Sequence, residues 1–241
     1  MKGVRRRAAR WCGAAALACA LAAPAAADTV KVGCVDFPPF TYEDADGRPA
    51  GRAIDLITDI LTRAGLPFEI KCYPGARLMA SLRDGSTHVA MLIKHPEVVE
   101  AALYGRRVMA YMQLNAYRLP ETPALGGIEN TRGKSVILLR GYGYGGWVDF
   151  FKNPANDLRL SFADSRPAAL KMLSNGHGDY LMDYQAPAAQ ALNGTSTPAL
   201  LSEPLVRLET YFLVSKRAPD AARLLKCIED TFAAMGAKPV D

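Results

Sequence analysis

The sequence predicts an α/β fold with two lobes, in which each lobe contains a mainly parallel sheet flanked by helices. Apolar runs of strand length alternate with helix-length segments of 3.6-residue periodicity, first over residues 30–93 and again over 135–182. The strand runs are apolar almost throughout, which is typical of parallel sheets covered on both faces. Two longer extended runs, at 108–117 and 206–215, predict two crossings between the lobes. These crossings divide the chain as follows: lobe 1 at residues 28–112 and 208–241, and lobe 2 at 113–207.

The first 27 residues have the three parts of a secretory signal peptide. Basic residues lie between Lys2 and Arg10, an apolar run covers 11–21, and Ala25-Ala26-Ala27 supplies the small residues that signal peptidase requires. The apolar run is shorter than the roughly 20 residues of a transmembrane helix. We therefore expect a mature chain that begins at Asp28 and lies in the periplasm.

The charge of the chain depends on this signal. The whole sequence holds 29 basic and 24 acidic residues, and five of the basic residues but none of the acidic ones fall within residues 1–27. The mature chain therefore has 24 of each sign, and its neutrality gives no reason to expect a nucleic-acid partner.

The mature cysteines are Cys34, Cys72 and Cys227, and their spacing matches no zinc site. Cys34 and Cys72 each fall near the end of a predicted strand, so a disulfide would form if those strands were neighbours. The favoured interpretation is that all three cysteines are buried free thiols. The three histidines are dispersed along the chain, and we expect neither a metal nor a cofactor.

The first half of the chain opens with a strand that ends at Phe37-Pro38-Pro39-Phe40, because proline lacks an N–H and restricts the residue before it. Ile54, Ile57 and Leu61 then recur at helical spacing, and Gly65 ends that helix. The expected elements are strands at 30–35, 68–73 and 87–93, and helices at 52–64 and 76–83.

The second half repeats the alternation. Asp164 or Ser165 is expected to cap a helix with Pro167 in its first turn, and a short strand then ends at Asp183. A carboxylate at the carboxyl end of a strand in an open α/β sheet is well placed for a ligand. The expected elements are strands at 135–139, 158–162 and 180–182, and helices at 165–176 and 220–234.

A glycine cluster over residues 141–146 formally matches the dinucleotide-binding pattern G-x-G-x-x-G. Only residues 147–152 remain for the helix that follows, whereas a crossover connection needs about a dozen residues. This spacing argues against a dinucleotide site. No Ser-His-Asp or Cys-His arrangement is visible, so we assign no catalytic residue and expect a protein that is not an enzyme.

Three segments carry a resemblance to a known family. Residues 32–42, with the Asp46-Gly47 turn and the segment 51–56, resemble the opening of the type 2 periplasmic solute-binding proteins of the polar amino-acid class, family 3 of the ABC importers. Tyr73-Pro74-Gly75-Ala76-Arg77 resembles a Pro-Trp-Ala-Arg element of that family, with Gly75 in place of the Trp. Residues 178–184 resemble the second-lobe strand that ends in a ligand-binding aspartate.

The resemblance implies a ligand cleft between the lobes, hinge closure on a small solute, and delivery of that solute by a monomeric protein to the membrane permease of an ABC importer. It implies that Phe37 stacks on the ligand and that Asp183 pairs with its amino group. The backbone N–H groups of the turn after Arg140 would bind its carboxylate. Together with the residues themselves, this gives eight candidate ligand-binding residues: Phe37, Arg77, Lys94, Arg140, Gly141, Tyr142, Gly143 and Asp183.

The chain also departs from the family pattern. Glu97 falls where amino-acid-binding members carry an arginine clamp, and Lys94 offers only a point charge nearby. Cys34 and Ala53 are apolar where binders of Lys or Arg are acidic, which argues against a dibasic ligand. We therefore expect a zwitterionic or anionic, amino-acid-like solute. The alternatives are an accessory protein that has lost the clamp and an enzyme similar to the periplasmic cyclohexadienyl dehydratases.

Overall fold

The computed structural model describes residues 28–193 and 199–240, and the predicted signal peptide at 1–27 lies outside this range. Its main sheet has eight strands in the order β4-β1-β5-β10-β6-β9-β7-β8. A small separate sheet pairs β2 with β3. The strands are β1 Val30–Cys34, β2 Tyr42–Glu43, β3 Pro49–Ala50, β4 Phe68–Cys72, β5 Val89–Ile93, β6 Ala102–Arg118, β7 Ser135–Leu139, β8 Arg159–Ala163, β9 Tyr180–Tyr184 and β10 Leu201–Ser215.

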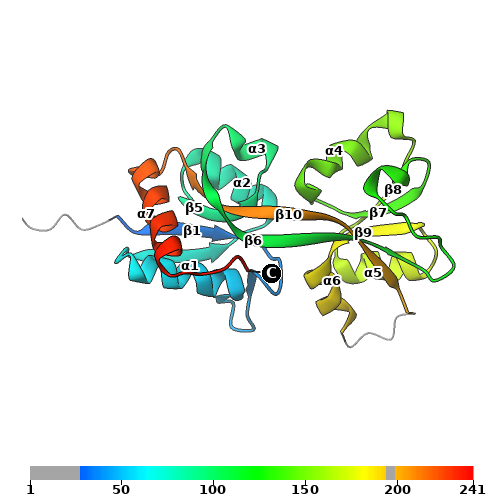
Figure 1. Cartoon of the computed structure of the whole chain (residues 1–241), viewed down its shortest axis with the longest axis horizontal. Coiled ribbons are helices and arrows are strands. Elements are labelled where there is room, and N and C mark those ends of the chain that lie inside the picture. The colour runs from blue at the N-terminus through cyan, green and yellow to red at the C-terminus, as the bar shows by residue number, and fades with distance from the viewer. Residues whose placement is uncertain (1–27, 194–198, 241) are drawn as a thin grey trace, which may run out of the picture.

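Helices cover both faces of the main sheet. In Figure 1, α2, α3 and α4 lie above it, and α1, α5 and α6 lie below it. The helices are α1 Arg52–Arg63, α2 Gly75–Asp84, α3 Pro96–Val99, α4 Trp147–Lys152, α5 Arg166–Ser174, α6 Gln185–Leu192 and α7 Ala221–Ala234, with short 3-10 turns η1 Ile128–Thr131, η2 Tyr144–Gly146 and η3 Pro154–Asn156. In the described part of the chain, none of the helices combines the length and apolarity that a membrane crossing requires.

Two long strands join the two halves of the molecule. β6 and β10 pair antiparallel and run through both halves (Figure 1). Lobe 1 carries β1, β4 and β5, in which β1 pairs parallel with both neighbours. Lobe 2 carries β7, β8 and β9, in which β7 pairs parallel with both neighbours. The predicted fold class is therefore confirmed, while the exact lobe boundaries stay a prediction.

Each lobe has its own apolar core. In lobe 1, α1 and α7 pack on one face of the sheet, where Ile57, Phe212 and Phe232 are buried together. In lobe 2, the turn before α4 and α4 itself bury Tyr144 and Phe151. Phe37 and Met112 pack against both of these cores. The molecule therefore has two packing units whose apolar side chains meet at one junction.

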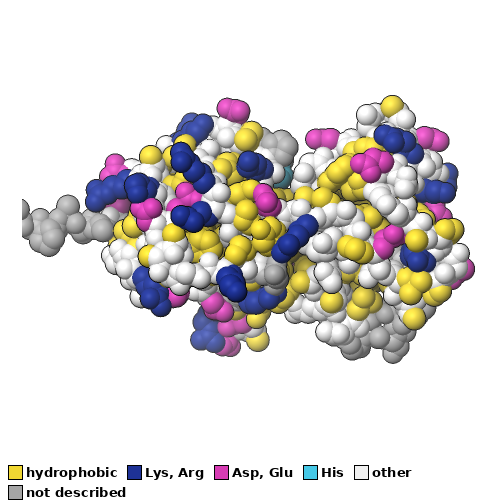
Figure 2. Space-filling model, in the orientation of Figure 1, with side chains coloured by type: hydrophobic (Ala, Val, Ile, Leu, Met, Phe, Trp, Pro, Cys, Tyr) yellow, Lys and Arg dark blue, Asp and Glu magenta, His cyan; other side chains and the backbone are white. Residues whose placement is uncertain are grey.

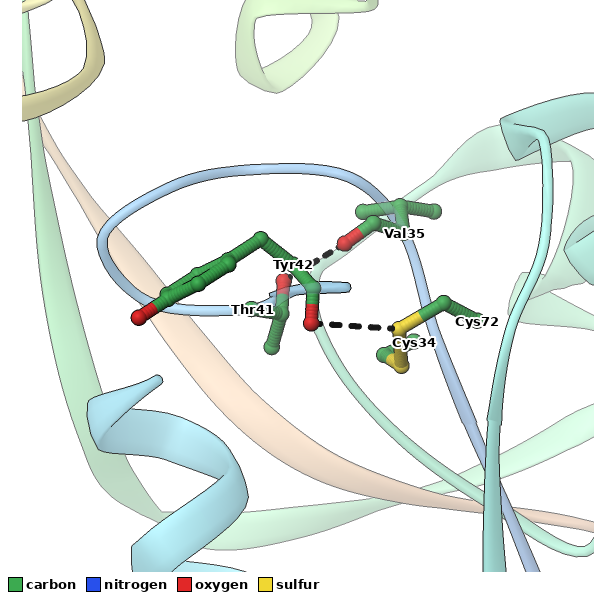
Figure 3. Close-up of a disulfide and its surroundings, with 5 residues drawn as sticks. All are labelled: Cys34, Val35, Thr41, Tyr42 and Cys72. Atoms are coloured by element: carbon green, nitrogen blue, oxygen red, sulfur yellow. Dashed lines mark hydrogen bonds between the residues drawn. A yellow bond between two sulfur atoms is a disulfide. The ribbon is translucent and has the colours of Figure 1, made fainter. Parts of the chain in front are cut away.

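The expectation of three free thiols was wrong for two of them. β1 and β4 are parallel neighbours in a register that places Cys34 opposite Cys72, with their Cα atoms 4.3 Å apart, and the two form a disulfide (Figure 3). Cys227 remains free and half-buried. Structural disulfides form and persist in oxidising compartments.

The sequence missed α6 and the last part of β9. Residues 185–192 contain Pro187 and show no strong apolar periodicity, so nothing in the pattern predicts a helix. β9 continues through Tyr184, because Asp183 and Tyr184 pair with β6. Asp183 therefore lies inside the strand instead of after its end.

We expect His88 to make stability pH-dependent. The backbone N–H of Lys31 donates to His88 Nδ1 at 3.3 Å, and burial lowers the pKa of this imidazole below its usual 6.5. Since the unfolded chain then binds the proton more readily, stability is full above the unfolded pKa and falls as pH drops through the folded pKa. Urea unfolding at about pH 5 and about pH 7.5 tests this. The unfolding free energy should decrease less between about pH 7.5 and about pH 5 in His88→Gln than in the wild type.

The matched control is His177→Gln, because His177 is exposed. It should keep the wild-type pH dependence. An equal decrease in unfolding free energy at the acidic pH in His88→Gln and the wild type would contradict this role of His88.

Candidate functional site: a cleft between the lobes

A cleft of about 850 Å³ lies where the two lobes meet. In Figure 2 an indentation separates the two halves of the molecule at the top of the view. The cleft is lined from both lobes and from the crossing strands. Its lining includes Asp36, Phe37, Phe40, Thr41, Glu43, Tyr73, Met79, Met91 and His95 from lobe 1, Gly141, Tyr142, Gly143 and Tyr184 from lobe 2, and Met109, Met112 and Thr210 from β6 and β10.

Three aromatic rings from different segments meet at this cleft. Phe37 follows β1, Tyr142 follows β7, and Tyr184 ends β9. The ring of Phe37 lies edge-on to Tyr184 with centroids 5.0 Å apart, and 6.3 Å from the centroid of Tyr142. Such rings offer a large apolar surface with little conformational freedom. Together they form an aromatic wall that spans the two lobes.

The turn after β7 places backbone N–H groups on the cleft. Gly141 has φ +82°, a left-handed conformation that glycine adopts without strain. Within the described residues, no hydrogen bond uses the N–H of Gly141 or of Gly143, and both residues line the cleft. Buried Tyr144 fixes the turn by accepting a hydrogen bond from the Leu139 N–H at its Oη, at 2.7 Å. Open amides held in this way can donate hydrogen bonds to a carboxylate.

A buried ion pair lies behind the aromatic wall. Arg166, the first residue of α5, donates from Nε to Asp183 Oδ2 at 2.7 Å, and the Tyr184 N–H donates to Asp183 Oδ1 at 2.8 Å. Burial raises the pKa of Asp183, and the positive charge of Arg166 opposes that rise. Because Asp183 is fully buried and Arg166 is 11% exposed, neither charge is well hydrated without the other.

The same guanidinium also holds the wall in place. Arg166 Nη2 donates to Tyr142 Oη at 3.3 Å. Its Cζ lies 5.5 Å from the ring centroid of Tyr142 and 5.7 Å from that of Phe37. Arg166 is therefore a positioning residue that connects Asp183 to two cleft-lining rings.

The structure brings four of the eight predicted site residues to the cleft, namely Phe37, Gly141, Tyr142 and Gly143. Asp183 is not among the lining residues, and its carboxylate is engaged by Arg166.

The three predicted cations do not line the cleft either. Arg77 and Lys94 are exposed and lie over the rings of Tyr73 and Tyr211, at 5.6 Å and 5.3 Å. Arg140 is exposed, and its Nε lies 2.7 Å from Asp164 Oδ1. The side chain of Glu97 lies outside the described part of the chain.

Several cleft residues were not predicted from the sequence. Tyr184 and Thr210 belong to extended runs in which nothing marks one residue as functional. His95 follows β5, and a Cβ atom placed on Gly143 would lie 3.4 Å from its Nε2, so the lobes also approach each other here. Arg166 directly follows the predicted helix cap Ser165, whose Oγ accepts from the Ala168 N–H. A basic residue near the start of a helix, where the helix dipole disfavours a cation, was the signal available for Arg166.

Comparisons with known proteins identify the fold. Residues 30–98 match the family model of bacterial extracellular solute-binding proteins, family 3. A histidine kinase sensor domain with similarity to periplasmic binding proteins matches with a TM-score of 0.73 and 19% identity over 88% of this chain and 91% of that one. The periplasmic VFT2 domain of Bordetella pertussis BvgS gives 0.68 and 20% over 86% and 88%. Holo ArgBP from T. maritima gives 0.67 and 19% over 88% and 92%. No curated protein matches the chain.

At these identities the solved structures establish the fold, and the family model covers β1 to α3, which contains Phe37 and the disulfide. The resemblance read from the sequence is thereby confirmed. The chain has the type 2 periplasmic binding protein fold, and its residues 30–98 are similar to the family 3 bacterial extracellular solute-binding proteins.

Proposed function

We propose that this protein captures a small amino-acid-like solute in the cleft between its lobes, in the periplasm, and delivers it to the permease of an ABC importer. The observation that carries this proposal is the cleft of about 850 Å³ lined from both lobes, with aromatic rings on its wall. Small-molecule sites are concave, mostly apolar and often lie between domains. The fold, the family match and the disulfide all favour a location outside the cytoplasm.

The lining favours a zwitterionic solute over an anionic one. Among the described residues that line the cleft, none is Lys or Arg, whereas Asp36 and Glu43 are acidic. The open N–H groups of Gly141 and Gly143 suit one carboxylate. A second carboxylate on the ligand would have no cation to pair with, while an ammonium group could pair with Asp36.

A second candidate is a sensory role. A histidine kinase sensor domain stands among the matching structures, and it covers 88% of this chain, as holo ArgBP does. Both roles use the same cleft, so ligand capture is common to them. Co-purification with a permease favours transport, and co-purification with a membrane kinase favours sensing.

The test is a thermal-shift panel of L-amino acids and small dicarboxylates with the mature chain, residues 28–241. A solute that binds only the native state raises the midpoint. We expect at least one zwitterion to raise Tm and the dicarboxylates to leave it unchanged. A panel without any shift would count against ligand capture and in favour of an accessory role.

Truncation of Phe37 should weaken binding of the solute found in that panel. Phe37 meets Tyr142 and Tyr184 at the centre of the aromatic wall, and aromatic anchors dominate binding energy at such positions. We expect Phe37→Ala to lower the affinity, measured by titration calorimetry, by about ten-fold or more.

Phe150→Ala is the matched control, because Phe150 makes its ring contacts with Trp147 and Phe151 and does not line the cleft. The affinity of Phe150→Ala for the solute should stay at the wild-type value. Equal affinities of Phe37→Ala and Phe150→Ala would show that the wall is not the binding surface.

A further inference from the structure

The cleft contains one buried hydroxyl group that the protein leaves without a partner. Thr210 on β10 is 2% exposed and lines the cleft. Its Oγ1 is buried and has no hydrogen-bond partner within the described protein. An unsatisfied buried hydroxyl is destabilising, so each such group in a folded protein needs an explanation.

The other threonine of the cleft shows the usual arrangement. Thr41 Oγ1 donates to the Val35 carbonyl at 2.7 Å, as Figure 3 shows. This hydroxyl is satisfied inside the protein and is not available to a ligand as a donor. The two threonines share one cleft and differ in whether their hydroxyl is already bonded.

Thr210 lies where the sheet is continuous, which limits the partners it can find. It pairs with Ile93 of β5 and with Ala110 of β6, and both of these side chains are apolar. The methionines of the same strands, Met91, Met109 and Met112, also line the cleft. Thioether side chains adapt to irregular apolar shapes and accept hydrogen bonds only weakly. The Thr210 hydroxyl oxygen is therefore buried beside the cleft, and the side chains that pair with Thr210 across the sheet are apolar.

We propose that Thr210 is a specificity-determining residue, and that the solute has an apolar body carrying one hydrogen-bonding group that reaches the Thr210 hydroxyl. This inference rests on the proposed function and adds the class of ligand side chain. The apolar body packs against the methionines, and its terminal hydroxyl or amide pairs with Oγ1. A ligand of the same shape without that group leaves the hydroxyl unpaired and binds more weakly.

The experiment measures affinities of the wild type and Thr210→Val for two matched pairs of amino acids. L-Tyrosine and L-phenylalanine differ by one hydroxyl, and L-glutamine and L-methionine have similar shapes but differ in their terminal group. We expect the wild type to favour the polar member of at least one pair by about ten-fold or more. Thr210→Val keeps the shape of the side chain and removes its hydroxyl, so this preference should disappear.

Stability provides the second measurement. Thr210→Val should unfold at the same temperature as the wild type or a higher one, since it removes an unpaired buried hydroxyl. Thr131→Val is the matched control, because Thr131 is fully buried away from the cleft and its Oγ1 donates to the Ile128 carbonyl. That variant should unfold at a lower temperature and keep the wild-type ligand preference.

The outcomes separate the two proposals. If neither pair nor any other zwitterion binds the wild type, the proposed function fails and the role of Thr210 fails with it. If amino acids bind but the wild type shows no preference within either pair, or Thr210→Val keeps that preference, only the role of Thr210 is overturned. A loss of stability in Thr210→Val equal to that of Thr131→Val also overturns it, because the hydroxyl would then be bonded inside the protein.

Discussion

An Arg166→Met variant should lose about 3–5 kcal/mol of unfolding free energy at neutral pH, because it leaves Asp183 buried without its cation. Asp183 is fully buried, and the bond from Arg166 Nε is 2.7 Å long. Among the described residues, the Tyr184 N–H would remain as the one other hydrogen-bond donor to this carboxylate. A single amide donor does not offset the desolvation of a carboxylate in an apolar surrounding.

The loss of unfolding free energy in Arg166→Met should be larger at high pH than at low pH. Without the guanidinium, the pKa of Asp183 rises further above its ordinary value of 3.8, because burial is then less opposed. A carboxyl with a raised folded-state pKa contributes stability below the unfolded pKa and loses that contribution as pH rises through the folded pKa. Urea unfolding should therefore show a larger deficit of Arg166→Met at about pH 8 than at about pH 5.

Two further variants test this explanation. Arg166→Met/Asp183→Asn should recover a large part of the loss, since both charges are gone. Arg140→Met removes a guanidinium from an ion pair of similar length, with Asp164, in which both side chains are more than half exposed. It should cost less than about 1 kcal/mol. Equal, small losses in Arg166→Met and Arg140→Met would contradict the buried character of the Arg166–Asp183 pair.

Removal of the Cys34–Cys72 disulfide should cost about 4 kcal/mol of unfolding free energy by the loop-entropy relation. The bond joins residues 38 positions apart, so it removes much of the freedom of the unfolded chain between β1 and β4. The measurement is urea unfolding of Cys34→Ser/Cys72→Ser beside the wild type, with and without reductant. The wild type should approach the double variant when reductant is present.

The free cysteine provides the control. Cys227→Ser removes a thiol that forms no disulfide, so its response to reductant should match that of the wild type. A double serine variant as stable as the wild type under oxidising conditions would show that the bond contributes nothing to stability.

The sequence predicted the fold well because the fold depends on patterns that a single chain displays. The helix over 52–64 was visible from Ile54, Ile57 and Leu61, which the structure buries against lobe 1. The glycine turn after β7 was visible from composition alone. Free thiols were favoured over the Cys34–Cys72 disulfide, wrongly, because the pairing depends on which strands are neighbours, and one sequence does not contain that information.

The site was harder to predict for a physical reason. Arg77, Lys94 and Arg140 have long side chains at strand or helix ends, and sequence position does not fix where such side chains point. The Arg166–Asp183 pair joins residues 17 positions apart that belong to no local motif. The unpaired hydroxyl of Thr210 becomes visible only when the surroundings of every other polar atom are known.

The central claim is that the cleft between the lobes binds one amino-acid-like solute through both of its charged groups. Titration calorimetry of residues 28–241 tests it directly, using the zwitterion with the largest thermal shift and its deaminated and decarboxylated analogues. We expect one site per chain. The affinity for each analogue should be at least about 100-fold below that for the zwitterion, since each analogue leaves a charged or hydrogen-bonding group of the cleft unpaired. Equal affinities for the zwitterion and both analogues would contradict it.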